Sequence, residues 1–308
     1  MRKCFCCSDR EIKKIYENLY DKNFFRGGKF SLLKCKKCNL EFISPLLNEK
    51  QLKNYYPEKE YYSFYDYNKL ALLYHKISAY YYSKKSNLFS VIFYPFSRIL
   101  YSYYIDKGKS ILEIGCGNGM KLNIYKKYGM KTYGLEPYGP PLRNKEKKLG
   151  ISKKSIKNAN FKKNSFDYII LKEVLEHIPN QRLVLMKCYE WLKPGGKLII
   201  TIPNTSGIWN KIFKKNWYGY DIPRHLYNYN PKNFSFFIKK FGFKIKKIRT
   251  YDMPYMLDGS LKFYLVDKTG KKEQSLIFSN LMKILIAPIS LIVTVLGSGS
   301  LIEAVCSK

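Results

Sequence analysis

The stretch 111–120, whose sequence is ILEIGCGNGM, constrains the fold of this chain more than any other. Residues 111–114 are mainly apolar and are typical of a short buried strand. The glycines that follow at once carry no side chain that would hold the backbone away from a ligand. Residues 120–128 then show the pattern of an amphipathic helix that ends at Gly129. A strand, a glycine turn and a helix N-terminus predict a cradle whose backbone N–H groups face a bound ligand.

The glycines of this stretch, Gly115, Gly117 and Gly119, have the spacing G-x-G-x-G. A dinucleotide-binding fingerprint, G-x-G-x-x-G, would place its third glycine at position 120, where this chain has Met120. The glycines alone therefore leave several nucleotide-like ligands open, with a nicotinamide cofactor among them.

Strand and helix patterns alternate after this stretch. The strand patterns cover residues 131–136, 151–158, 166–171, 197–202, 243–250 and 301–306. The turn KPGG at residues 193–196 introduces the strand at 197–202, and a helical pattern covers residues 231–241. This alternation predicts an α/β fold with a doubly wound, mostly parallel, Rossmann-like sheet.

Carboxylates and a histidine follow two of these strands directly. Glu136 ends the strand after the glycine helix, where a nucleotide-type fold places the carboxylate that binds the ribose hydroxyls. The strand at 166–171 continues into a loop that carries Glu173, Glu176 and His177. Because ligands in open α/β sheets bind at the carboxyl ends of the strands, we expect these side chains at the binding edge.

The first forty residues contain two C-x-x-C pairs. Such pairs can place four thiolates tetrahedrally around one Zn²⁺, and Asn39 after the second pair tolerates the left-handed backbone that a metal-binding turn needs. No ligand position is left for water, so the expected site is structural. Cys6 could replace Cys4 or Cys7, and four buried free cysteines are the other interpretation. The predicted ligands are Cys4, Cys7, Cys35 and Cys38.

The compartment and partners are predicted from charge and cysteine usage. The formal net charge is +33, but the lysines are spread along the whole chain, so we expect a diffuse basic surface with weak attraction to anionic membranes and no specific nucleic-acid readout. Residues 1–3 lead into the cysteine cluster without an apolar signal segment. We therefore expect a cytoplasmic protein, peripheral at most at the inner membrane face.

Two further segments have helical patterns. Residues 46–105, rich in tyrosine, predict a helical linker or cap with helices over 48–56, 67–82 and 87–105, and His75 within it is expected to be structural. Residues 276–296 are apolar and contain Pro288. A strand pattern follows them, so we expect helices that pack on the domain or lie in a membrane interface, rather than a span.

Several of these motifs, in this order, resemble those of the class I S-adenosylmethionine-dependent methyltransferases. They are residues 111–120, Glu136, residues 164–179 and the segment LKPGGKLIITIPN at 192–204. The N-terminal cysteine pairs and the segment WYGYDIPRHLY at 217–227 resemble a bacterial subgroup that often accompanies surface-polysaccharide or lipid biosynthesis.

The resemblance implies a seven-stranded sheet whose last strand is antiparallel. It also implies S-adenosylmethionine as cofactor, with Glu113 and the glycines at the methionine end, Glu136 on the ribose and residues 157–160 beside the adenine. The implied cofactor-binding residues are Glu113, Gly115, Cys116, Gly117, Gly119, Glu136, Pro137, Asn158, Lys172 and Glu173. Relatives usually have glycine after each C-x-x-C, where this chain has Ser8 and Asn39.

Methyl transfer to a hydroxyl needs a base with a pKa near neutrality, and histidine suits that role. The chain has three histidines. We predict His225, in the loop with Asp221 and Arg224, as the base, with His177 as the second candidate. Trp209, Trp217 and Tyr218 are candidates for an acceptor pocket, and ordinary core packing is the other interpretation of these aromatic residues.

The predicted organisation is a zinc-ribbon-like module at 1–45, a helical linker at 46–105 and a methyltransferase domain at 106–308 with an apolar helical insertion at about 258–298. The leading hypothesis is O-methylation of a sugar, a glycolipid or another small acceptor. A nicotinamide dehydrogenase is disfavoured by Met120 and by the KPGG turn. The alternative from another class is a cofactor-sensing regulatory module whose zinc unit and basic surface contact a membrane or a nucleic acid.

Overall fold

The computed structural model describes residues 3–57, 72–73, 75–76, 79–80, 104–270 and 280–308. These residues form two compact units. Unit 1 comprises Met1–Tyr55, Glu173–Pro179 and Ile200–Ala304. Unit 2 comprises Tyr56–Lys172, Asn180–Ile199 and Val305–Lys308. The predicted helices at 67–82 and 87–105 lie almost wholly outside the described residues, whereas the predicted helix at 48–56 is present as α1 (Glu49–Lys53).

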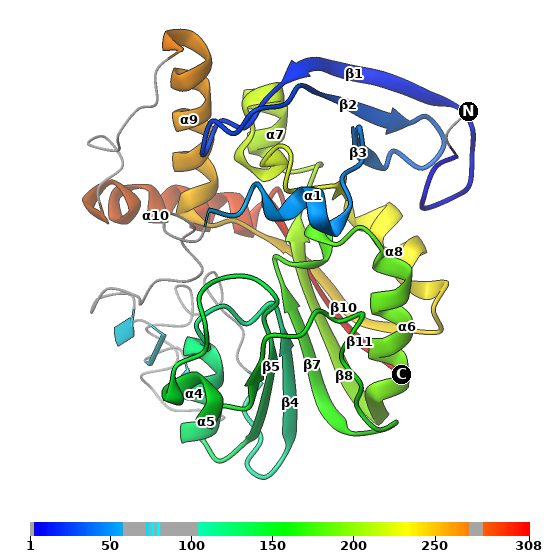
Figure 1. Cartoon of the computed structure of the whole chain (residues 1–308). Coiled ribbons are helices and arrows are strands. Elements are labelled where there is room, and N and C mark those ends of the chain that lie inside the picture. Colours follow the sequence, from blue (N-terminus) through cyan, green and yellow to red (C-terminus); the bar gives the residue numbers. More distant parts are fainter. Residues whose placement is uncertain (1–2, 58–71, 74, 77–78, 81–103, 271–279) are drawn as a thin grey trace. The chain divides into compact units, whose positions relative to one another are not determined.

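The larger sheet has seven strands, as predicted. Its order is β10-β11-β8-β7-β4-β5-β6, with β4, β5, β6 and β7 paired in parallel and the last strand antiparallel (Figure 1). The fold is therefore the expected Rossmann-like α/β fold. The strands are β4 (Ser110–Ile114), β5 (Lys131–Leu135), β6 (Ile151–Ser152), β7 (Phe166–Lys172), β8 (Leu192–Pro203), β10 (Lys244–Tyr251) and β11 (Leu301–Ser307).

The central strands form because their residues are apolar on both faces, which suits a sheet covered on both sides. All five residues of β4 and all seven of β11 are buried. In unit 2, α4 packs beside β5, and Leu122 and Ile124 of this helix are buried. Besides α1, the structure describes the α-helices α4 (Met120–Lys127), α5 (Asn144–Lys148), α6 (Gln181–Trp191), α7 (Ile208–Phe213), α8 (Pro231–Lys239), α9 (Pro254–Thr269) and α10 (Asn280–Val295).

Two strands differ from the sequence prediction in length. β6 has two residues instead of the predicted 151–158, because the chain turns at Ser155, whose carbonyl accepts the N–H groups of Asn158 and Ala159. β8 begins at Leu192 and includes the predicted KPGG turn. Gly195 adopts φ +73°, so these residues form an irregular start of the strand and do not precede it.

A second sheet, in unit 1, contains the N-terminal segment. It consists of β1 (Ile12–Leu19), β2 (Phe30–Cys35), β3 (Glu41–Ser44) and the short β9 (Tyr227–Asn228), in that order and antiparallel (Figure 1). Because Phe42 of β3 pairs with Tyr227 of β9, the N-terminal segment shares its sheet with the loop that carries His225.

The apolar segment at 276–296 forms α10, apart from its first residues, which lie outside the described part of the chain. Ile286, Ser290 and Val293 are buried, whereas Ile289, Ile292, Val295 and Leu296 are exposed. The helix therefore packs on unit 1 through one face, against α9 and β10. None of the described helices is both long enough and apolar enough to cross a membrane.

Candidate active site

The predicted cradle is present in unit 2. β4 ends at Ile114, and α4 begins at Met120 after a left-handed Gly119 with φ +75°. Glycine suits this position because its backbone is left-handed, and a Cβ atom there would also lie 2.4 Å from the end of the Ile151 side chain, which would have to shift. The turn leads directly into the N-terminus of an eight-residue helix, the kind of backbone at which polar ligand groups often bind.

Glu136 holds the glycine turn from the end of β5. Its carboxylate accepts the N–H of Gly117 at 2.9 Å and that of Tyr138 at 3.0 Å. Burial raises the pKa of Glu136, and these two N–H donors partly offset the rise. An ionised carboxylate has lone pairs for about four hydrogen bonds, so two remain for the hydroxyls of a ribose.

Glu113 presents a buried oxygen at the same turn. Its side chain is 2% exposed, and Oε1 lies 3.4 Å from Nζ of Lys121. Oε2 has no hydrogen-bond partner among the described residues. Burial raises the pKa of Glu113, while the Lys121 ammonium opposes the rise. An unpaired carboxylate oxygen beside a glycine turn fits a ligand with an ammonium group.

The other predicted cofactor residues of unit 2 differ in their surroundings. Cys116 is buried, and desolvation raises the pKa of its thiol well above the usual value, so the thiol is an inert packing group. Pro137 and Asn158 are exposed, and Lys172 is half-buried at the end of β7.

The loop predicted to flank the adenine is held by a residue that the sequence analysis did not single out. Nζ of Lys187 on α6 donates to three carbonyl oxygens, those of Ile156 at 2.9 Å, Lys157 at 2.9 Å and Ala159 at 2.8 Å. These three charge-assisted bonds fix the loop that contains Asn158.

Glu173, the first residue after β7, belongs to unit 1 and has a strained backbone. Its φ is +55°, its N–H donates to the carbonyl of Thr201 at 2.8 Å, and its Oε2 accepts the hydroxyl of Tyr255 at 2.7 Å. A non-glycine residue held in the left-handed region costs of order 1–3 kcal/mol and is frequent at ligand sites.

The same unit brings both predicted bases together with Glu176. The rings of His177 and His225 have centroids 4.5 Å apart, and one ligand atom from each of the three side chains lies within 4.8 Å of the others. His225 and Glu176 are buried, and His177 is half-buried. We call these three residues the histidine–glutamate cluster.

Hydrogen bonds to carbonyl groups orient both rings of the cluster. Nδ1 of His225 lies 2.6 Å from the carbonyl oxygen of Gly219, and Nδ1 of His177 lies 3.1 Å from that of Arg224. Since a carbonyl oxygen can only accept, each Nδ1 carries the proton and each Nε2 carries the lone pair.

Burial shifts the pKa values of the cluster toward the uncharged forms. Desolvation lowers the pKa of His177 to about 3, and the neighbouring His225 adds to the effect. Desolvation also lowers the pKa of His225, although Asp221 opposes it. The pKa of Glu176 is raised well above its usual value by burial, and neither of its oxygens has a hydrogen-bond partner among the described residues. Both imidazoles are thus neutral near pH 7.

A buried ion cluster holds the loop that carries His225. Arg224, with no exposed surface, contacts Asp21 through Nη2 at 2.8 Å and Nη1 at 3.0 Å, and contacts Asp221 through Nη2 at 2.6 Å and Nε at 2.7 Å. Nδ2 of Asn23 also donates to Asp221 at 2.6 Å. Arg224 therefore ties the N-terminal segment to the histidine loop. The sequence showed Arg224 and Asp221 together but gave no sign of Asp21.

The aromatic candidates for an acceptor pocket have different roles. Trp217 is completely buried and packs edge-on against Tyr220, and Nε1 of Trp209 donates to Asp252 at 2.9 Å, so both tryptophans are core residues. Tyr218 is half-buried next to Tyr255 and is the candidate that can face a ligand. His75 is 2% exposed, consistent with the structural role expected for it.

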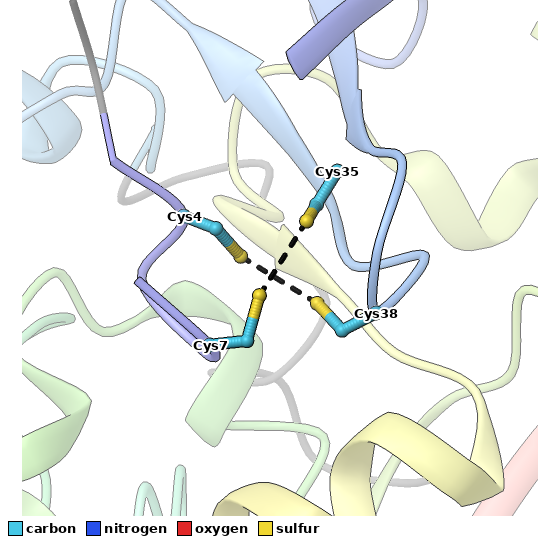
Figure 2. A group of neighbouring side chains, drawn as sticks. All are labelled: Cys4, Cys7, Cys35 and Cys38. Carbon is cyan, nitrogen blue, oxygen red and sulfur yellow. Dashed lines mark hydrogen bonds between the residues drawn. The ribbon is translucent and has the colours of Figure 1, made fainter. Parts of the chain in front are cut away.

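The four predicted metal ligands come together near the N-terminus. Their sulfur atoms point toward one another, with Cys4 and Cys38 3.5 Å apart and Cys7 and Cys35 3.5 Å apart (Figure 2). Tetrahedral Zn²⁺ with bonds of 2.3 Å separates its sulfurs by about 3.8 Å, so the donor set fits. Cys6 points elsewhere, to the carbonyl of Asn233 at 3.6 Å.

The backbone after each cysteine pair is left-handed, with φ +64° at Ser8 and +61° at Asn39. The N–H of Ser8 donates to the carbonyl of Cys4, and that of Asn39 donates to the carbonyl of Cys35. The two cysteine turns therefore have matching geometry, although neither has a glycine after its second cysteine.

Curated proteins of known function match about a third of this chain. A phosphoethanolamine N-methyltransferase of Plasmodium falciparum is 31% identical over 113 residues, which are 34% of this chain and 42% of that protein. A mitochondrial ubiquinone biosynthesis O-methyltransferase of Rattus norvegicus is 30% identical over 110 residues, or 32% of this chain and 31% of that protein. The ubiquinone biosynthesis O-methyltransferase of Nitrosococcus oceani is 35% identical over 105 residues, which are 32% of this chain and 44% of that protein. The matches thus span less than half the length of these relatives.

Solved structures resemble the chain more loosely. A methyltransferase of Archaeoglobus fulgidus has a TM-score of 0.43 at 18% identity, covering 78% of this chain and 100% of that one. One of Thermotoga maritima has a TM-score of 0.44 at 17% identity, covering 78% and 94%. The sequence model of the methyltransferase domain family matches residues 87–248, just over half of the chain and the whole of the cradle. The chain therefore belongs to the methyltransferase domain family.

Proposed function

We propose that this protein is an S-adenosylmethionine-dependent methyltransferase that acts on a hydroxyl of a sugar, a glycolipid or another small acceptor. The cradle supports the cofactor most directly. Glu113 offers an unpaired buried oxygen to an ammonium group, and Glu136 keeps two acceptor positions for a ribose. The family match includes both residues.

S-adenosylmethionine supplies a methyl group on a positively charged sulfur. The acceptor oxygen forms a bond to the methyl carbon as the carbon–sulfur bond breaks and its electron pair stays on sulfur. The hydroxyl proton is released in the same overall reaction. The residues of the chain therefore have to position the acceptor, exclude water and favour loss of this proton.

The histidine–glutamate cluster is what favours an oxygen acceptor. Both imidazoles are neutral near pH 7 and each has a lone pair on Nε2, as assigned from its carbonyl partner. His225 stays the first candidate for the proton acceptor, because burial and the neighbouring His225 lower the pKa of His177 to about 3, too low for a base near pH 7. At His225, Asp221 is the first group that opposes the effect of burial on the pKa. Among the relatives above, the printed names include both O- and N-methyltransferases.

A transfer assay tests this function. The full chain is incubated with methyl-labelled S-adenosylmethionine and with separated sugar, lipid and protein pools from cells. We expect label in a sugar or lipid pool, held as a methyl ether that mild base does not release. Label in protein alone, or as a base-labile methyl ester, would contradict the proposed acceptor. Cofactor binding without transfer to any pool would favour a cofactor-sensing module.

The His225→Ala variant sharpens this assay. Turnover should fall by more than about a hundredfold, the usual contribution of a positioned proton acceptor. Affinity for S-adenosylmethionine should change little, because the cofactor is proposed to be held by the glycine turn, Glu113 and Glu136. Unchanged turnover would exclude His225 from the reaction.

We also propose that the thiol cluster binds structural Zn²⁺ in the cytoplasm. Four sulfurs within 4.8 Å of one another, two left-handed turns and the absence of any disulfide among the eight cysteines support this assignment. A peripheral position at an anionic membrane, the inner face of the cell membrane, is proposed from the net charge of +33 and the exposed apolar residues of α10.

A further inference from the structure

The histidine–glutamate cluster brings two imidazoles and a carboxylate together in the interior of unit 1. A single proton acceptor would need only one of these groups. Glu176 and His177 come from a short 3₁₀ helix (Leu175–His177), and His225 comes from the loop before β9. The three ligand atoms lie within 4.8 Å of one another. Two imidazoles and one carboxylate form a donor set typical of divalent transition metals.

The hydrogen bonds of the two rings suit metal binding. A histidine that binds a metal usually donates its other ring N–H to a carbonyl or a carboxylate, which fixes the tautomer and the ring orientation. The carbonyls of Gly219 and Arg224 have this position relative to His225 and His177. With Nδ1 of each ring placed against a carbonyl oxygen, Nε2 is the nitrogen through which each ring would bind a metal.

Glu176 provides the second, independent observation. Its side chain has no exposed surface, and both carboxylate oxygens lack hydrogen-bond partners among the described residues. Leaving such a group buried without a partner is unfavourable, and more so if it is charged. A cation held between Glu176 and the two imidazoles would satisfy the carboxylate and neutralise its charge.

The backbone around the cluster is fixed before any ligand binds. The N–H of Leu226 donates to the carbonyl of Glu176 at 2.8 Å, which joins the two segments that carry the three residues. Arg224, next to His225, is fully engaged by Asp21 and Asp221, so its charge is balanced locally. Two metal–ligand bonds of about 2.1 Å separate two ligand atoms by at most about 4.2 Å. Because the ligand atoms lie within 4.8 Å of one another, small side-chain rotations would bring all three into bonding distance of one ion.

We propose that Glu176, His177 and His225 bind a divalent cation such as Mn²⁺, Fe²⁺, Co²⁺ or Zn²⁺. With three protein ligands, such an ion keeps positions open for an exogenous oxygen. On the proposed function, on which this role rests, that oxygen is the acceptor hydroxyl. Coordination by a cation would make the hydroxyl lose its proton to water more readily. His225 and His177 would then act as metal ligands, and this role would replace that of direct proton acceptor considered above.

Mn²⁺ is the probe, because it prefers nitrogen and oxygen ligands and leaves a thiolate site to zinc. The full chain, loaded with zinc at the thiol cluster, is titrated with Mn²⁺, and the free ion is measured by electron paramagnetic resonance. We expect one bound Mn²⁺ per chain. His177→Ala, His225→Ala and Glu176→Gln should each weaken binding by more than about tenfold.

Matched variants separate this site from the remaining candidates. His75→Gln, which removes the third histidine of the chain, and Cys35→Ser, which damages the thiol cluster, should both leave Mn²⁺ affinity unchanged. Absence of Mn²⁺ binding in the unsubstituted chain, or unchanged affinity in Glu176→Gln, would overturn the proposal.

Thermal unfolding checks that a lost signal is not a lost fold. Without metal, Glu176→Gln should unfold at the same or a higher temperature than the unsubstituted chain, because it removes an unpaired buried acid. Added Mn²⁺ should raise the unfolding temperature of the unsubstituted chain and not that of the variant. An equal rise in both would count against the site.

The two proposals fail in different ways. Mn²⁺ binding at the cluster without any methyl transfer would leave the metal site standing and remove the proposed function. The opposite result is methyl transfer from labelled S-adenosylmethionine without Mn²⁺ or another bound cation, and no Mn²⁺ binding in the titration. That result would support the function and contradict the metal site.

Discussion

Single residues decide the chemistry of both candidate sites, and the sequence revealed them unequally. Glu113, Glu136 and the glycines could be predicted because a strand, a tight turn and a helix impose a local spacing. Glu176 could be placed in the loop, but its lack of partners depends on packing from distant segments. Asp21 lies far from Arg224 in the chain, so no local pattern predicts their contact.

Arg224 illustrates the energetic consequence of such a contact. Arg224→Met would leave Asp21 and Asp221 buried and without their cation, so we expect the free energy of unfolding to fall by about 3–5 kcal/mol. Urea unfolding followed by circular dichroism measures this change. Lys14→Met, which breaks an exposed pair with Glu17, should cost less than about 1 kcal/mol. Equal losses in the two variants would contradict the role of the buried cluster.

Asp167 makes a pH-dependent contribution in unit 2. Burial raises its pKa, but hydrogen bonds from Lys193 and Ser110 outweigh this effect and lower the pKa from 3.8 to about 2. A carboxyl whose pKa is lowered in the folded state stabilises the protein above its unfolded pKa. The stabilisation, about 2 kcal/mol, is lost as the pH falls from about 4 to about 2.

The Asp167→Asn variant isolates this contribution, because other titrating groups cancel between the two proteins. At neutral pH the variant should be less stable by about 2 kcal/mol, and the difference should disappear below about pH 2. Denaturant unfolding at a series of pH values gives the difference. A gap that stays constant down to the lowest pH would show that Asp167 has an ordinary pKa.

Among the elements, the parallel strands and their helices could be predicted, because their apolar residues repeat at the periods of buried strands and helices. β4, β5, β7, α4 and α8 lie where the patterns placed them. The shortness of β6 and the early start of β8 were missed, since the first depends on a turn at Ser155 and the second on pairing with neighbouring strands. The pairing of β3 with β9 joins residues distant in the chain and had no sequence signal.

Zn²⁺ at the thiol cluster, as proposed, would stabilise the N-terminal sheet at one end. Removing Zn²⁺ should lower the unfolding temperature of the protein, because the two cysteine turns lose their common ligand while β3 remains paired with β9. Mass spectrometry under native conditions should show one zinc per chain, lost in Cys35→Ser and kept in Cys6→Ser, whose thiol faces Asn233. Zinc retained by Cys35→Ser would contradict the assignment.

At the scale of the whole molecule, charge and the exposed face of α10 act together. We expect the net charge of +33 to attract the chain to anionic surfaces. Ile289, Ile292 and Val295 of α10, and Leu296 just after it, are exposed and could enter the membrane interface. The protein should sediment with phosphatidylserine vesicles and not with phosphatidylcholine vesicles. Ile292→Ser together with Val295→Ser should weaken the binding by about tenfold or more. If the double variant bound the vesicles as tightly as the unsubstituted chain, binding would depend on charge alone and the role of α10 would be contradicted.

The central claim is that the cradle built by β4, Gly119, α4 and Glu136 binds S-adenosylmethionine. Isothermal titration of the full chain tests it most directly. We predict a one-to-one complex with S-adenosylmethionine and none with NAD. Glu136→Gln should weaken the complex by about tenfold, because the charge that accepts the ribose hydroxyls is lost, whereas Glu17→Gln on exposed β1 should have no effect. Binding of NAD, or binding of S-adenosylmethionine that Glu136→Gln leaves unchanged, would contradict this account.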